Sequence, residues 1–163
     1  GTKYVSGSQD SLGIVLPGLN RLYYNGDYWP ESIESITDRD LLGWIEERLW
    51  LVPLSPRHAE YDVLADTHIN ESDAQRLSQA AEACWQALKA KDVIAWGKAA
   101  SDSFEAQVAM FPNMIISEVS TVLETYKSKV LGWKISGAGG GGYLVFVSEQ
   151  PVEKAIQIRI RRG

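Results

Sequence analysis

The spacing of apolar and polar positions divides the chain into helices and short strands. Three long stretches repeat apolar residues every three or four positions, the period of a helix with one buried face. They are residues 71–90, 92–110 and 114–130. Shorter stretches are rich in aromatic and branched apolar side chains, or alternate isoleucine with arginine, as strands do. They are residues 19–24, 50–52, 131–135, 143–147 and 156–161. This order predicts an α+β fold: an antiparallel sheet with helices packed on one face.

Local signals add detail to this pattern. Residues 7–16 are compatible with a short helix, and Asn25-Gly26 is a strong hairpin signal, so we expect residues 27–33 to form the return strand. Thr37 is a residue type that begins helices, which predicts a helix after it. Gly132 follows the third long helical stretch and is expected to end it.

Side chains of the predicted helices supply the expected core. Along residues 71–90 one face carries a set of apolar residues: Ala74, Leu77, Ala81, Cys84, Trp85 and Leu88. Along residues 92–110 the matching face carries Val93, Trp96, Ala100, Phe104 and Val108. Tryptophans can stack on sugars, but Trp44, Trp85 and Trp96 lie near apolar stripes, which favours packing in the core.

Composition limits the classes of function. The chain has 163 residues, of which 45% are hydrophobic and 23% charged, as in ordinary globular domains. The net charge of −5 argues against nucleic acid or an anionic membrane as the main partner. No signal peptide or membrane span is evident, and a single cysteine excludes an internal disulfide, so we expect a cytoplasmic protein. The first residue is Gly1 rather than Met, which indicates a processed product, a cloning remnant or a fragment.

The run Gly137-Ala138-Gly139-Gly140-Gly141-Gly142 is the most distinctive chemical feature. Five of its six residues lack a Cβ, so its N–H groups can come close to an anion. The run matches the Gly-x-Gly-x-x-Gly dinucleotide pattern, but that pattern must open a helix, whereas a strand sequence follows here. The alternative is a tight hairpin in which glycine serves only the turn, although two-residue turns need one or two glycines.

The polar stretch over residues 55–70 has the irregular character of a functional loop. Arg57 and His58 are its candidates for contacts with a sugar or a phosphate. The alternative is a surface turn in which these side chains pair with Glu60 or Asp62. The two histidines and the cysteine lack the spacing of a metal site, so no metal ligand is predicted.

Two segments together resemble the GHMP kinase superfamily, named for galacto-, homoserine, mevalonate and phosphomevalonate kinases. Residues 135–143, Ile-Ser-Gly-Ala-Gly-Gly-Gly-Gly-Tyr, are similar to its third motif. Residues 7–10, Gly-Ser-Gln-Asp, followed by Pro-Gly-Leu-Asn at 17–20, are similar to the segment that carries the catalytic aspartate in the sugar-kinase branch. Within that branch the sequence resembles heptose-phosphate kinases, fucokinases and galactokinase-like proteins, over nearly the whole chain.

The resemblance implies a function. Asp10 would accept the proton of a sugar hydroxyl, and residues 137–142 would approach the substrate and the transferred phosphate. The implied reaction moves the γ-phosphate of ATP to a sugar or sugar phosphate. The superfamily's first motif and its Ser-Ser phosphate loop are absent from the chain. ATP and Mg²⁺ would therefore be held mainly by a missing N-terminal half, and the chain alone would be inactive.

The resemblance also implies a domain division. Residues 1–55 would be the end of the N-terminal kinase domain with connecting strands, and residues 56–163 the ferredoxin-like C-terminal domain. Two alternatives stay open: a non-catalytic module that binds a small ligand or partner, and a kinase for small acids or isoprenoid precursors. We also consider that the protein forms a homodimer.

Overall fold

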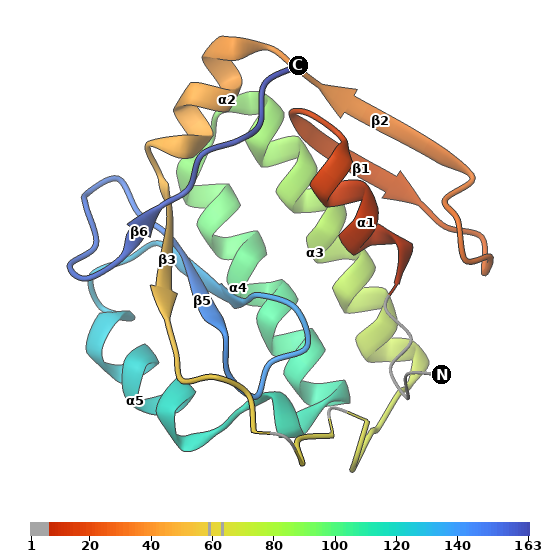
Figure 1. The fold of residues 1–163 in the computed structure, drawn as a ribbon, viewed down its shortest axis with the longest axis vertical. Coiled ribbons are helices and arrows are strands. Elements are labelled where there is room, and N and C mark those ends of the chain that lie inside the picture. Colours follow the sequence, from red (N-terminus) through yellow and green to blue (C-terminus); the bar gives the residue numbers. More distant parts are fainter. Residues whose placement is uncertain (1–6, 59, 63) are drawn as a thin grey trace. The chain divides into compact units, whose positions relative to one another are not determined.

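A computed structural model describes residues 7–58, 60–62 and 64–163 (Figure 1). The chain forms two compact units. The hairpin unit contains the described residues up to Gly43 together with Arg159–Gly163, and the sheet unit is Trp44–Ile158. Each unit has one antiparallel sheet, which confirms the predicted α+β class. The predicted domain division at residue 55 stays a prediction.

The hairpin unit contains helix α1 (Ser8–Val15) and the two-stranded sheet of β1 (Leu19–Tyr23) and β2 (Ser32–Ile36). The return strand begins later than the predicted residue 27. Pro30 lacks an N–H group and cannot donate to a ladder, so pairing starts beyond it, with Tyr23 opposite Ser32.

Helix α2 (Arg39–Glu46) begins one residue later than the sequence signal suggested. Its cap is Asp38, whose Oδ1 accepts a hydrogen bond from the N–H of Leu41 at 2.7 Å. The prediction of Thr37 as the cap was therefore wrong. A carboxylate is a better acceptor at a helix N-terminus than a hydroxyl, because it also interacts favourably with the helix dipole.

The sheet unit holds four antiparallel strands in the order β4-β5-β3-β6. They are β3 (Leu49–Pro53), β4 (Gly132–Ile135), β5 (Tyr143–Val147) and β6 (Ile156–Gln157). The last strand is much shorter than the predicted residues 156–161, although isoleucine and arginine alternate throughout. Its ladder stops after two pairs, and Arg159–Gly163 belong to the hairpin unit.

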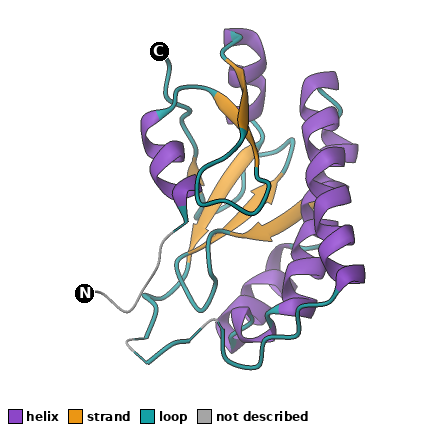
Figure 2. Cartoon of the chain, turned by 90° about the vertical axis from the view of Figure 1, so that its right-hand side faces the viewer, coloured by secondary structure: helices purple, strands orange, loops and turns teal. Residues whose placement is uncertain are grey.

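The helices of the sheet unit are α3 (Glu71–Ala90), α4 (Val93–Met110), the 3₁₀ turn η1 (Pro112–Met114) and α5 (Ser117–Tyr126). In Figure 2 the long helices stand beside the strands of the four-stranded sheet. The third predicted helix, over residues 114–130, was too long. Ile116 is extended, with φ −95° and ψ 162°, so the helix cannot start before Ser117. Gly132 is the first residue of β4 and not a helix end.

The core of the sheet unit lies between its helices and one face of the sheet. Phe104 of α4 and Val119 of α5 join the alternate strand residues that point to this face. Those strand residues are Val52, Ile135, Leu144 and Phe146. Tyr126 of α5 packs on the Phe146 ring with centroids 5.4 Å apart. Helix periodicity and strand alternation therefore converge on one apolar cluster.

The predicted helix faces are correct for α4 and partly wrong for α3. Trp96, Ala100 and Phe104 are buried, as expected. On α3 the large residues Trp85 and Leu88 are buried, but Ala74 and Ala81 are exposed. Ala80 and Ala87 are buried instead. Alanines fit on either side of the stripe, so their spacing alone does not fix the edge of the buried face.

Trp44 is the least buried of the three tryptophans predicted for the core. It is half-buried, whereas Trp85 and Trp96 are buried. The Trp44 ring packs on the Trp96 ring, with centroids 5.7 Å apart. All three therefore serve packing.

Two glycines allow α4 and β4 to touch through their main chains. A Cβ added to Gly132 would lie 1.8 Å from the carbonyl oxygen of Gly97, and one added to Gly97 would lie 2.5 Å from that of Leu131. Neither distance is compatible with a real side chain, so both positions need glycine for close packing.

We therefore expect Gly132→Ala to lower the free energy of unfolding by about 3 kcal/mol, because the new methyl group meets rigid backbone. Urea denaturation measures this difference. Gly43→Ala is the control, since a Cβ there meets nothing within 4 Å. It should leave stability unchanged or raise it by up to about 1 kcal/mol through helix propensity. Equal stability of the two variants would contradict the close packing.

Lys134 of β4 is a polar group that the sheet unit partly buries. Its Nζ donates to Ser103 Oγ at 3.0 Å and to Gln107 Oε1 at 2.7 Å, both on α4. Burial lowers the pKa of the Lys134 ammonium. Burial also raises the pKa of the half-buried Cys84 thiol, and the charge of Lys134 opposes part of that rise.

We expect the Cys84 thiol to be alkylated by iodoacetamide more slowly than a free cysteine at neutral pH. Its raised pKa leaves less thiolate at neutral pH. The rate of alkylation should therefore increase at a higher pH than it does for an ordinary thiol. Lys134→Gln should slow the reaction further, because the cation that favours the thiolate is gone. A folded Lys134→Gln protein that reacts faster than the wild type would exclude this electrostatic pairing.

Candidate functional site

The glycine loop, residues 137–142, connects β4 to β5. All five of its glycines have positive φ, at 69°, 73°, 68°, 138° and 88° in chain order. Only glycine adopts such values without strain. A two-residue hairpin turn needs at most two such positions, so the loop is longer and more contorted than tight turning requires.

Three of these glycines pack against the chain itself. A Cβ on Gly139 would lie 2.8 Å from Met114 Cα, and one on Gly140 would lie 2.3 Å from the Tyr61 ring. A Cβ on Gly141 would lie 2.5 Å from the carbonyl oxygen of Ser55. Internal packing therefore accounts for the missing side chains at these positions, where the sequence suggested an approach to a ligand. At Gly137 and Gly142 an added Cβ meets open space.

Hydrogen bonds hold the loop on residues 55–61 and on η1. The hydroxyl of Tyr61 donates to the carbonyl oxygen of Ala138 at 2.8 Å, and Arg57 Nε donates to that of Gly139 at 2.9 Å. The N–H groups of Gly140 and Gly142 donate to the carbonyl oxygens of Met114 and Ser55, at 3.3 and 3.2 Å. These bonds fix the orientation of successive peptide planes in the loop.

The supporting segment is itself held by α5. Glu118, in the first turn of that helix, accepts the N–H of Ser55 with both carboxylate oxygens, at 3.1 and 2.9 Å. A charged acceptor strengthens such bonds. The first turn of α5 therefore positions Ser55, and the carbonyl oxygen of Ser55 in turn binds the glycine loop.

Three successive N–H groups of the loop are unpaired, at one exposed, one half-buried and one buried residue. Those of Gly137, Ala138 and Gly139 donate to no group within the described part of the chain. The sign of φ is positive at Gly137 and Gly139 but not at Ala138. Where the sign of φ alternates between successive residues, their N–H groups can form a concave site for an anion. Gly137 is exposed and Ala138 is half-buried, so solvent reaches this end of the loop.

Arg57 adds a positive charge beside these N–H groups. Its Nε is bonded to the loop, and its guanidinium lies over the Tyr61 ring, 5.5 Å from the centroid. Within the described residues its two terminal nitrogens have no hydrogen bond or ion pair. The predicted alternative, an ion pair of Arg57 with Glu60 or Asp62, is not formed among these residues. The guanidinium is anchored at one nitrogen and open at the other two.

Tyr61 is a site residue that the sequence analysis missed. Burial raises the pKa of its hydroxyl, an effect that the charge of Arg57 opposes and that of Asp62 reinforces. The hydroxyl therefore keeps its proton near neutral pH and can donate to Ala138. A large aromatic residue inside an otherwise polar loop, four positions after an arginine, was the available signal.

His58 contributes less than the sequence suggested. Its side chain is exposed, and its carbonyl oxygen accepts the N–H of Tyr61 at 3.0 Å. It therefore shapes the turn between Arg57 and Tyr61 through its main chain. No contact of its imidazole with the glycine loop is formed among the described residues.

Asp10 belongs to the hairpin unit, in the first turn of α1. The preceding Ser8 is buried, and its Oγ bonds to the hydroxyl of Tyr24 at 2.9 Å and the carbonyl oxygen of Tyr28 at 2.5 Å. These bonds anchor the start of α1. The carboxylate of Asp10 is exposed and takes no hydrogen bond from the described residues.

The described residues contain no group of three or more histidine, cysteine, aspartate or glutamate side chains arranged to hold a metal ion. Among these same residues, every helix is too short or too polar for passage through a bilayer.

Comparison with known proteins gives the fold its context. No family model matches the chain. A curated protein, the L-fucokinase/L-fucose-1-P guanylyltransferase of Bacteroides fragilis, is 30% identical over 74 residues, 45% of this chain and 8% of that protein. A crystal structure of mevalonate kinase matches with a TM-score of 0.58 and 16% identity, over 81% of this chain and 46% of the kinase.

The matched segments cover less than half of either relative. The structural match extends over most of this chain, including an antiparallel sheet with helices, while the sequence match is confined to a shorter segment. The chain therefore shares its fold with part of mevalonate kinase.

Proposed function

We propose that this chain is the C-terminal part of an ATP-dependent kinase that phosphorylates a hydroxyl group of a sugar or sugar phosphate. The observation that carries the proposal is the run of three unpaired N–H groups at Gly137, Ala138 and Gly139, beside the open guanidinium of Arg57. Its expected location is the cytoplasm, where ATP is available.

Phosphoryl transfer asks a protein mainly to position the reactants and stabilise negative charge. The three N–H groups are donors that need no reorganisation, because the loop's own bonds already orient them. Arg57 Nη1 and Nη2 offer a planar pair of charged donors, which suits phosphoryl oxygens. These groups fit the phosphoryl oxygens of ATP or of the product.

Asp10 is the proposed proton acceptor, a role taken from the resemblance. A sugar hydroxyl is a weak nucleophile, and a carboxylate within hydrogen-bond reach can take its proton as the oxygen bonds to phosphorus. ATP, when bound, supplies the phosphoryl group and leaves as ADP. We assign no step to Mg²⁺, because the described residues offer no cluster of metal ligands. The N-terminal half of the longer protein would hold ATP and Mg²⁺.

Two features support a longer protein. The hairpin unit exposes large apolar side chains, among them Ile14 at 74% and Trp29 at 58%. Its sheet has two strands, and such a sheet is marginal without further packing. Both features are explained if the segment belongs with an N-terminal kinase domain that covers these side chains.

A sugar is favoured as the substrate by the similarity to an L-fucokinase, which shares 30% identity over 74 residues. The second candidate is an isoprenoid-precursor kinase, which the mevalonate kinase structure favours. That match has 16% identity and speaks for the fold alone. A binding module without chemistry is the third candidate, because a fold does not determine function.

In the full-length protein, Asp10→Asn should lower kcat at least about a hundredfold, since the proton acceptor is lost. A coupled ADP-release assay with hexoses, heptose phosphates, mevalonate and homoserine would measure this and identify the substrate class. Asp40→Asn is the matched control, an exposed aspartate in the first turn of α2. Unchanged turnover in Asp10→Asn would remove Asp10 from the mechanism, and turnover of mevalonate alone would exclude a sugar kinase.

Tyr61→Phe should lower kcat about fivefold, because the bond that orients the Ala138 peptide, of about 1 kcal/mol, is lost. The matched control is Tyr126→Phe, which removes a tyrosine bond of similar length, to the carbonyl oxygen of Glu153 at 2.9 Å. Both variants should lose similar stability in thermal unfolding, but only Tyr61→Phe should lose activity. Equal activity of the two variants would show that the loop's orientation does not matter for catalysis.

A further inference from the structure

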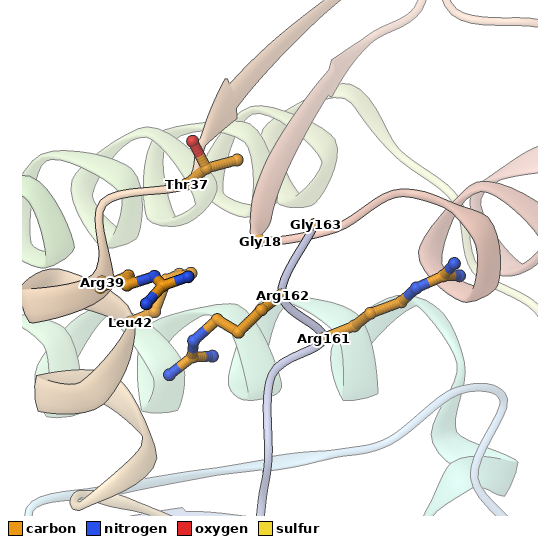
Figure 3. A pocket seen from close by; sticks show the side chains of 7 residues that line it. All are labelled: Gly18, Thr37, Arg39, Leu42, Arg161, Arg162 and Gly163. Carbon is orange, nitrogen blue, oxygen red and sulfur yellow. The ribbon is translucent and has the colours of Figure 1, made fainter.

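A pocket lined by arginines lies within the hairpin unit. It has a cavity volume of about 270 Å³ (Figure 3). Its lining residues are Gly18, Thr37, Arg39, Leu42, Arg161, Arg162 and Gly163. It shares no residue with the glycine loop or with the proposed proton acceptor.

The pocket forms where the C-terminal segment meets the start of β1. The N–H of Gly18 donates to the carbonyl oxygen of Arg161 at 2.8 Å. Gly18 has a φ of +77°, and a Cβ there would lie 2.3 Å from the carbonyl oxygen of Ile36. Glycine at this position therefore lets the end of β2, the start of β1 and the C-terminal segment come together. Main-chain contacts therefore bring together segments that form the pocket walls.

The lining is strongly positive. Three arginines and no acidic residue line the pocket. Such a concentration is notable in a chain whose net charge is −5.

The three arginines play different parts. Arg161 Nη1 donates to the carbonyl oxygens of Ile14 and Val15 at the end of α1, at 3.0 and 3.2 Å, which holds its side chain away from the cavity. Figure 3 shows the side chains of Arg39 and Arg162 extending to the other side of the C-terminal segment. Arg39 makes no hydrogen bond or ion pair with the described residues. Its guanidinium is available to a ligand.

We propose that this pocket binds a small molecule that carries a phosphate group. A guanidinium matches the geometry of phosphate oxygens and donates two bonds at once. The Thr37 hydroxyl also lines the cavity and has no partner among the described residues, and Leu42 supplies an apolar wall. A volume of about 270 Å³ suits a phosphorylated metabolite of sugar size better than a nucleotide.

The test is isothermal titration of the full-length protein with ribose 5-phosphate, inorganic phosphate and uncharged ribose. All measurements use an Arg57→Ala background, so that the glycine loop contributes as little as it can. Ribose 5-phosphate and phosphate should bind, and ribose should not. Arg39→Ala should weaken binding of ribose 5-phosphate at least tenfold, while Arg39→Lys should restore part of it. Arg76→Ala, an exposed helical arginine outside the pocket, should leave binding unchanged.

Thermal unfolding provides the second measurement. Ribose 5-phosphate should raise the Tm of the Arg57→Ala protein, and Arg39→Ala should abolish that rise without lowering the Tm of the free protein, because Arg39 is exposed. Equal binding of ribose and ribose 5-phosphate, or equal affinity with and without the Arg39 side chain, would overturn the proposal. Binding that persists in a variant without kinase activity, Asp10→Asn, supports the pocket independently of the proposed function.

Discussion

The candidate site depends on two hydrogen bonds, which Arg57 and Tyr61 make to carbonyl oxygens of the glycine loop. Arg57 Nε donates a hydrogen bond to the carbonyl oxygen of Gly139, and the Tyr61 hydroxyl donates one to that of Ala138. In a trans peptide the C=O and N–H point in opposite directions, so fixing the Ala138 carbonyl directs the Gly139 N–H away from Tyr61. The flexible glycine sequence becomes a fixed set of donors through contacts outside the loop.

The same contacts explain why a run so rich in glycine can be ordered at all. Glycine loses more conformational entropy on folding than any other residue. Here the cost is offset by packing of Gly139, Gly140 and Gly141 against Met114, Tyr61 and Ser55, and by the hydrogen bonds of the loop's main chain. The loop is packed against the chain at Gly139, Gly140 and Gly141, and its exposed end, at Gly137 and Ala138, has unpaired N–H groups.

The two units differ in how complete their cores are. The sheet unit encloses an apolar cluster between α4, α5 and the alternate residues of its strands. The hairpin unit has a two-stranded sheet and large exposed apolar side chains, and its order rests on main-chain and polar contacts such as Ser8 with Tyr24 and Gly18 with Arg161. A two-stranded sheet of this kind is marginal without further packing.

The sequence by itself determined the α+β class, the bounds of α3, and the glycine loop between two strands, because these follow from periodicity and from residue types that favour one local conformation. The tertiary structure decided the rest. Ile115 and Ile116 read as helix by their spacing, but Ile116 is extended and both pack against the core. Tyr61 and Ala138 are 77 positions apart, and the role of Tyr61 exists only because the fold brings Tyr61 to the glycine loop. Local sequence records conformational preference, whereas such contacts depend on where distant strands and helices meet.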